Sequence, residues 1–156
     1  MQVTQEEYMR AVNSNTWKPA FLFRIDLEEA LPYVSQLIFV PDTQEIMRIN
    51  SVIKTFPPIR FLFQIKGGKS RIEVYENAFR TDVHENVGDF LSSLIDHEGF
   101  HAYEINKGSW KMVYGCEKRA MDNQIKNFPK RNISPTYREK FVEMYTRVNG
   151  LEPKIN

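Results

Sequence analysis

Apolar residues recur at helical spacing in several parts of the chain. A helix is predicted over about residues 82–104, because apolar side chains stand there at intervals of three and four, at Val83, Val87, Phe90, Leu91 and Leu94. Further helices are predicted over 116–128, which ends before a proline, and over about 134–148, which starts at a Ser-Pro pair. Shorter helices are expected over 4–13 and over about 43–55, the latter behind a capping-box pattern.

Alternating apolar and polar residues predict β-structure in the middle of the chain. IRFLFQIK at 59–66 and KSRIEVYE at 69–76 are joined through two glycines, which predicts a hairpin with one buried face. LIFVPD at 37–42 is predicted to be a short strand, and PAFLFRID at 19–26 is rich in strand-forming residues. The intervening LEEALPYVSQ fits neither pattern. Helices and strands together predict the α+β class.

The composition describes one folded domain. A chain of 156 residues with 42% apolar residues is long enough for a single core over 1–156. With 21 Lys and Arg against 20 Asp and Glu, the net charge of +1 favours neither nucleic acid nor an acidic membrane as partner. A single cysteine and the lack of a signal-peptide pattern or a long apolar run favour the cytoplasm. The oligomeric state stays open.

Two of the three histidines stand in the pentapeptide HEGFH, residues 97–101. Residues four apart on an α-helix project from nearly the same face, so both imidazoles can bind one ion. Catalytic zinc takes three protein ligands and a water, and a nearby carboxylate can accept the proton of that water. The motif therefore indicates a zinc site with His97 and His101 as ligands and Glu98 as general base, a known metalloprotease pattern.

The alternative is a helix whose histidines are only hydrogen-bonded. With three histidines, this spacing with an adjacent glutamate arises by chance in roughly a few sequences per thousand. However, the apolar stripe of the helix continues into Glu98, His101 and Ile105. Burying such groups costs roughly several kcal/mol unless they are bonded or liganded, which favours the metal site. Gly99 suggests close approach by substrate or a neighbouring strand, or simply a glycine tolerated near a helix end.

Two polar residues of the same predicted helix are poor candidates for the third ligand. His84 lies about 20 Å from His97 along the helix axis and is expected to be exposed in the first turn. Glu104 is too far from His97 to complete a tetrahedron, and we expect it to support the site or to lie at the surface.

The following helix offers two better candidates. Glu117 is expected on its buried stripe, since Ala120, Met121 and Gln124 follow at three, four and seven residues. A glutamate on such a stripe is explained by a metal, so we favour Glu117. Cys116 is the alternative, because sites with two histidines and one cysteine exist, although a lone cysteine is more often a small buried residue.

HEGFH followed by EKRAMDNQ resembles the gluzincin branch of the zincin metallopeptidases, especially its very small members. The resemblance covers about residues 59–128. It implies that His97, His101 and Glu117 hold one Zn²⁺ ion and that Glu98 activates a zinc-bound water to hydrolyse peptide bonds.

The resemblance also implies an active-site helix over about 82–104, a "glutamate helix" over about 116–128, and a small mixed or antiparallel sheet. Ala120 matches a small residue that often follows the third ligand. An edge strand of that sheet would align an extended peptide or unfolded protein substrate, and residues 71–79 are in the right place for it.

The sequence departs from the gluzincin pattern at two points. Met121 stands where many gluzincins have an aspartate that supports a histidine, and Asp122 is one residue further on. The residue that stabilises the oxyanion has no clear match, although Tyr103 and Tyr114 are nearby. Two other functions stay open: zinc binding without efficient peptidase activity, and a metal-free structural or interaction domain.

Overall fold

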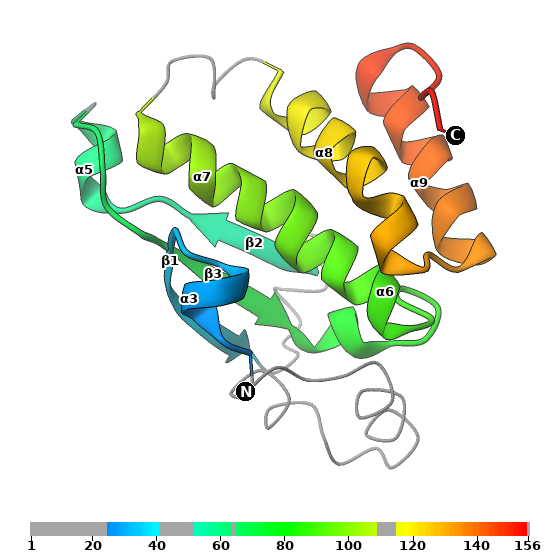
Figure 1. The fold of residues 1–156 in the computed structure, drawn as a ribbon, viewed down its shortest axis with the longest axis horizontal. Coiled ribbons are helices and arrows are strands. Elements are labelled where there is room, and N and C mark those ends of the chain that lie inside the picture. Colours follow the sequence, from blue (N-terminus) through cyan, green and yellow to red (C-terminus); the bar gives the residue numbers. More distant parts are fainter. Residues whose placement is uncertain (1–24, 41–51, 64, 109–114, 156) are drawn as a thin grey trace.

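The computed structural model describes residues 25–40, 52–63, 65–108 and 115–155 (Figure 1). The fold of this part is mixed α+β with a small mixed sheet, as the sequence predicted at that level. The predicted elements over 4–13 and, for the most part, over 19–26 and 43–55 lie outside the described residues. The elements are α3 (Leu27–Ala30), β1 (Val34–Val40), β2 (Ile53–Phe56), α5 (Ile59–Leu62), β3 (Ser70–Tyr75), a 3₁₀ turn (Glu76–Phe79), α6 (Val87–Leu91), a π-helical segment (Ser92–Glu98), α7 (Gly99–Lys107), α8 (Cys116–Arg131) and α9 (Pro135–Asn149).

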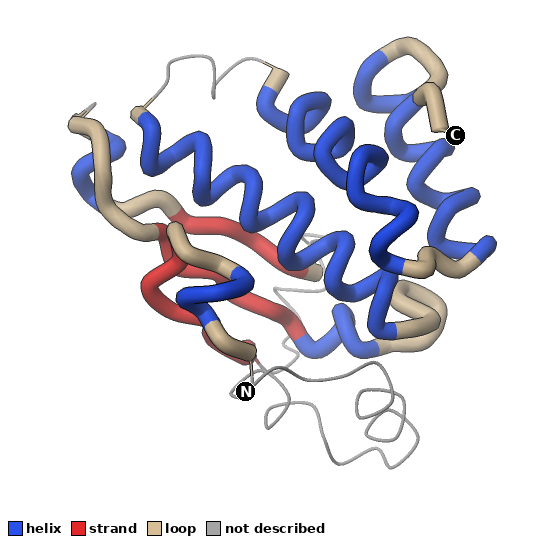
Figure 2. Tube along the Cα trace, viewed as in Figure 1, coloured by secondary structure: helices blue, strands red, loops and turns tan. Residues whose placement is uncertain are grey.

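The three described strands form one sheet in the order β1-β3-β2, with β1 parallel and β2 antiparallel to β3. Figure 2 shows the long helices on one side of these strands. Ile72 in β3 pairs with Leu37 of β1 and with Thr55 of β2. Ile72 and Val74 are fully buried, because β3 has a paired strand on each side and the long helix over one face. Burial on this scale is the main favourable term in folding.

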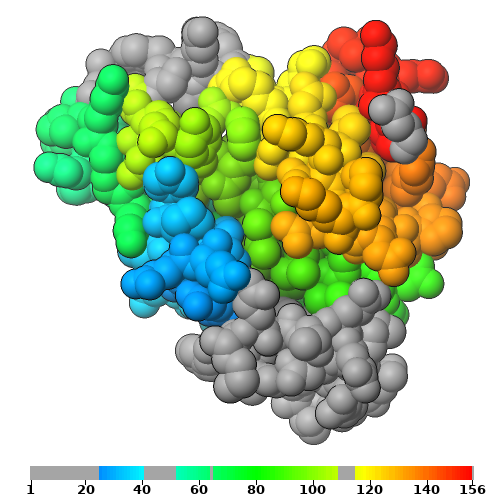
Figure 3. All heavy atoms as spheres, viewed as in Figure 1, coloured from blue at the N-terminus to red at the C-terminus, as the bar shows by residue number. Residues whose placement is uncertain are grey.

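Segments α6, π and α7 run as one continuous helix across the sheet, and α8 and α9 follow beside it (Figure 1). Phe90, Leu94 and Ala102 of this helix are fully buried in the core that it forms with the sheet. A second, smaller core joins α8 to α9 through Met121, Phe128, Phe141 and Tyr145. In the space-filling view α7, α8 and α9 lie against one another across the visible face (Figure 3). In the described residues, no helix is long and apolar enough to cross a membrane.

Two predictions about the sheet are wrong. The run 59–66 is not a strand: α5 takes up its first four residues, and Ile59, Leu62 and Phe63 are each 71% exposed. The antiparallel partner of β3 is instead Ile53–Phe56, where a helix was predicted. At the glycine pair, the N–H of Gly67 donates a hydrogen bond to the backbone carbonyl of Asn106 at the end of α7. Tertiary pairing has therefore overridden local patterns in both segments.

Two helix boundaries differ from the prediction, and the bounds of a third helix are confirmed. The helix expected from residue 82 begins only at Val87, because the side chain of Asn86 caps it by accepting from the Asp89 amide. Helix α8 continues through Pro129 to Arg131, whose guanidinium is paired with the buried carboxylate of Asp96. The prediction for α9 is confirmed, with Ser134 as its N-cap and the following proline in its first turn.

Candidate metal centre

Three side chains that the sequence analysis assigned to zinc converge in the structure. His97 and His101 project from the long helix, and Glu117 projects from the first turn of α8. The Oε1 atom of Glu117 lies 2.9 Å from Nε2 of His101, and its Oε2 atom lies 3.1 Å from Nε2 of His97. The two Nε2 atoms are 3.2 Å apart. One possible ligand atom from each residue therefore lies within 4.8 Å of the others, and two imidazoles with one carboxylate are a donor set that zinc takes.

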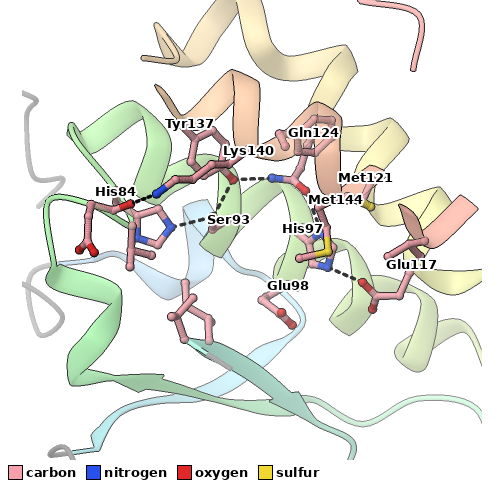
Figure 4. Close-up of a pocket in the computed structure, with 16 residues that line it drawn as sticks. His84, Ser93, His97, Glu98, Glu117, Met121, Gln124, Tyr137, Lys140 and Met144 are labelled. Carbon is pink, nitrogen blue, oxygen red and sulfur yellow. Dashed lines mark hydrogen bonds and ion pairs between the residues drawn. The ribbon is translucent and has the colours of Figure 1, made fainter. Parts of the chain in front are cut away.

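The position of Glu117 corrects one detail of the prediction. The stripe of α8 is buried at Ala120, Met121 and Gln124, as expected, but the Glu117 side chain is 53% exposed. It lies in the first helical turn and points toward His97 (Figure 4), whereas the residues of the stripe further along are buried. A carboxylate that is still half in water loses less hydration than one on a buried stripe.

His97 and Glu98 lie in the π-helical segment, which the sequence analysis did not foresee. The amide of Gly99 donates to the carbonyl of Leu94, five residues earlier instead of four. π-helical turns are rare and occur frequently at functional sites. Residues 92–98 therefore follow π-helical spacing, and α-helical spacing resumes at Gly99.

Gly99 is explained by close packing with a part of the core. A Cβ atom at this position would lie 2.9 Å from Cδ2 of Leu31, which is 1% exposed and follows α3. The close approach comes from this leucine, where the sequence suggested a substrate or a strand. The turn of the helix that carries Glu98 is thereby packed directly against the α3–β1 segment.

Gln124 supports His97, a contact that the sequence analysis missed. Its Oε1 atom lies 2.7 Å from Nδ1 of His97, so the ring nitrogen that faces away from Glu117 has a buried partner. Asp122, which was considered for this role, accepts instead from Tyr145 and pairs with Lys118. The signal available in the sequence was an amide side chain on the otherwise apolar stripe of α8.

Glu98 is held by a strand. The hydroxyl of Thr55 in β2 donates to Oε2 of Glu98 at 2.6 Å and lies 3.3 Å from its backbone oxygen. Burial raises the pKa of the Glu98 carboxyl above its ordinary value, and the nearby histidines and the Thr55 bond only partly oppose this. A general base needs a pKa near the working pH, which such a shift favours.

The histidines and Glu117 perturb one another. Burial alone would lower the pKa of His97, but the hydrogen bond that it donates to Glu117 and the charges of Glu98 and Glu117 raise it overall. Hydrogen bonds from His101 and His97 hold the pKa of Glu117 well below its usual range. Mutual stabilisation of this kind is typical of functional sites.

Of the other residues that were considered as the third ligand or as the oxyanion stabiliser, those that the structure describes do not join the three convergent side chains. Cys116 lines a cavity beside the histidines but is outside the convergent group, and burial raises the pKa of its thiol. Glu104 is buried and accepts from Arg119, which agrees with a supporting role. Tyr103 packs against Tyr33 with ring centroids 5.5 Å apart, and Tyr114 lies outside the described residues.

Two cavities open onto the convergent residues. One of about 400 Å³ has β2 as a wall, through Lys54 and Thr55, and also touches His97, Glu98 and Glu117. The other, of about 450 Å³, extends from the same three residues towards α9, as Figure 4 shows, and is lined there by Tyr137, Lys140, Phe141 and Met144. The centre therefore lies where a ligand could reach it from two sides.

Comparisons with known proteins do not decide the family. No family model, no curated protein and no solved structure matches this chain.

His84 is buried, in contrast to the exposed position expected from the sequence. It precedes α6, is 3% exposed, and bonds the carbonyl of Ala78 through Nδ1 at 2.6 Å and Ser93 through Nε2 at 2.8 Å. Burial lowers the pKa of His84 below its ordinary value, although the Ala78 bond opposes this. The ring is therefore held neutral in the fold.

We expect His84 to destabilise the metal-free protein in acid. Below about pH 6.5 the unfolded chain takes up a proton at this histidine that the folded chain refuses, so the free energy of unfolding falls as the pH falls. Urea unfolding with a chelator present, at about pH 7.5 and about pH 5.5, should show a smaller loss for His84→Gln than for the wild type, by roughly 1 kcal/mol. An equal loss in both proteins would contradict the burial of a neutral ring.

Proposed function

We propose that this protein is a zinc-dependent metallopeptidase of the gluzincin type, in which His97, His101 and Glu117 hold one Zn²⁺ ion. The observation that carries the proposal is the meeting of Glu117 with both histidines. Their places on one continuous helix explain why the two imidazoles are close, but they do not bring a carboxylate from a separate helix to within 3.1 Å of each. The support of His97 by Gln124 adds the partner that metal-binding histidines almost always have.

The remaining residues supply the acid–base chemistry. A zinc ion held at this centre would act as a Lewis acid and lower the pKa of a water molecule to about 7. Glu98 accepts a proton from the attacking water and later gives it to the leaving amine. Thr55 fixes Oε2 of Glu98, so the carboxylate keeps one orientation through both transfers.

We infer that β2 aligns the substrate. The prediction that residues 71–79 provide an edge strand is wrong, because β3 is paired on both sides. Among the described strands β2 lies at the sheet edge, and it forms the cavity wall beside Glu98. An extended peptide or unfolded protein can bind such an edge through its backbone, with little demand on side-chain identity.

Metal analysis and a cleavage assay test the proposal together. Protein purified without a histidine tag should bind one zinc ion per chain after reconstitution, and should cleave an unfolded protein substrate. Chelation should stop cleavage, and added zinc should restore it. His101→Ala should fail in both measurements.

The two alternatives give different outcomes. One zinc ion per chain without cleavage would indicate a zinc-binding protein that is not an efficient peptidase. A zinc stoichiometry near zero would indicate a metal-free structural or interaction domain and would overturn the proposal.

A further inference from the structure

A line of buried and partly buried polar groups connects His84 to His97 through α9 (Figure 4). The oxygen of Ser93 lies 2.7 Å from the hydroxyl oxygen of Tyr137, which in turn lies 2.9 Å from Nε2 of Gln124. With the bonds already described at each end, five hydrogen bonds in series join a backbone carbonyl to a histidine of the metal centre. The order is Ala78, His84, Ser93, Tyr137, Gln124 and His97.

The first bond of this line fixes the direction of the next. A carbonyl oxygen only accepts, so Nδ1 of His84 donates to Ala78. Since burial keeps His84 neutral, its Nε2 atom carries a lone pair and accepts from the hydroxyl of Ser93. The single proton of Ser93 is then in use.

Each later group therefore has only one way to bond. Tyr137 donates its proton to Ser93, and its oxygen accepts from the amide nitrogen of Gln124. The second N–H of that amide points to the oxygen of Ser92, 3.0 Å away. With its nitrogen held in this way, Gln124 presents its oxygen to His97. A flipped amide would set its oxygen against a Tyr137 oxygen that has no proton to give.

We propose that Tyr137 is a positioning residue whose hydroxyl, through Gln124, keeps a proton on Nδ1 of His97, so that Nε2, which faces His101 and Glu117, is the nitrogen that a metal ion can take. An amide oxygen can only accept, so His97 donates from Nδ1 to Gln124. The tautomer so fixed is the one that can give Nε2 to a metal ion. The C-terminal helix thereby acts on the centre without contributing a ligand.

The tautomer can be measured in the metal-free protein. The ¹⁵N chemical shifts of the His97 ring, recorded at alkaline pH where the ring is neutral, should show protonated Nδ1 in the wild type. Tyr137→Phe keeps the ring of the side chain but removes the hydroxyl, so the Gln124 amide is free to turn, and the proton should move towards Nε2. Ser93→Ala should act in the same direction, because it releases the Tyr137 proton for a flipped amide.

Two further variants separate positioning from general damage. Tyr145→Phe removes a hydroxyl from the same helix, one that donates to Asp122 instead, and should leave the His97 shifts unchanged. Adding Gln124→Glu to Tyr137→Phe should return the proton to Nδ1, since an ionised carboxylate can only accept. Wild-type shifts in both Tyr137→Phe and Ser93→Ala, or no return in the double variant, would overturn the proposal.

The effect on metal binding rests on the proposed function, whereas the tautomer does not. Zinc affinity measured by chelator competition should fall about 10- to 100-fold in Tyr137→Phe, the usual loss when a partner of a liganding histidine is removed, and should be unchanged in Tyr145→Phe. If the wild type binds no zinc, the peptidase proposal fails while the ¹⁵N result still decides the role of Tyr137. If zinc binds equally well to Tyr137→Phe, the positioning role is overturned and the peptidase proposal stands.

Discussion

Glu98→Gln is expected to lower kcat/KM for an unfolded protein substrate by about 1,000-fold while zinc stays bound, since general acid–base groups contribute about 10²- to 10⁴-fold. The amide has nearly the shape of the carboxylate and still offers an oxygen to the Thr55 hydroxyl, so the contact with β2 is kept. What the variant loses is the ability to take up a proton. Cleavage should be followed with a quenched fluorescent substrate, and zinc by elemental analysis of the same sample.

Two companion variants make the result specific. Glu143→Gln removes a negative charge at an exposed position of α9 and should leave both measurements unchanged. Thr55→Val keeps the carboxylate but removes the group that orients it, so a loss between those of the other two variants is expected. If Glu98→Gln cleaved as fast as the wild type, Glu98 would have no part in the mechanism.

Features set by neighbouring residues could be predicted from the sequence. Helix α9 starts and ends as its Ser-Pro and Asn-Gly signals indicate, because cap bonds form between residues a few positions apart. The pairing of His97 with His101 is equally local. Glu117 could be proposed because it opens the next helix, but only the packing of α8 against the long helix brings it to the histidines.

The sheet could not be predicted in this way because strand pairing is a long-range choice. IRFLFQIK has the better alternating pattern, yet Ile53–Phe56 pairs with β3. The shorter segment has the advantage of position: it lies against the π segment and the start of α7, where Ile53 is buried and Thr55 reaches Glu98. Propensity is a weak guide when two segments compete for one partner.

The residues that support the histidines could not be predicted from the sequence, for a related reason. Gln124 and Tyr137 lie on different helices, and their contact depends on how α8 packs against α9. In the π segment the hydrogen bond spans five residues instead of four, and the spacing of apolar residues in the sequence does not reveal this change. His84 was expected on the surface because the helix was expected to start before it. The true start at Val87 leaves His84 in a turn that folds back onto the core.

Glu117→Ala should reduce zinc affinity by about 1,000-fold, and Cys116→Ser should change it by no more than about twofold. Zinc binding to protein sites is worth roughly 10–16 kcal/mol shared among the ligands, so one ligand accounts for about 4 kcal/mol. Both oxygens of Glu117 already lie beside the histidines, whereas Cys116 is outside the convergent group. Chelator competition at one fixed pH gives the affinities, because ligand protonation makes them depend on pH.

The neighbouring positions of these two residues make the comparison decisive. Both open α8, and the Glu117 side chain is 53% exposed, so truncating it leaves no cavity in the core that would unfold the protein. Both metal-free variants should therefore remain folded, which cooperative unfolding curves would show. The reverse result, with zinc lost in Cys116→Ser and kept in Glu117→Ala, would place a thiolate at the third position. The gluzincin assignment would then be wrong even if the protein were a zinc peptidase, because that assignment depends on a glutamate from this helix.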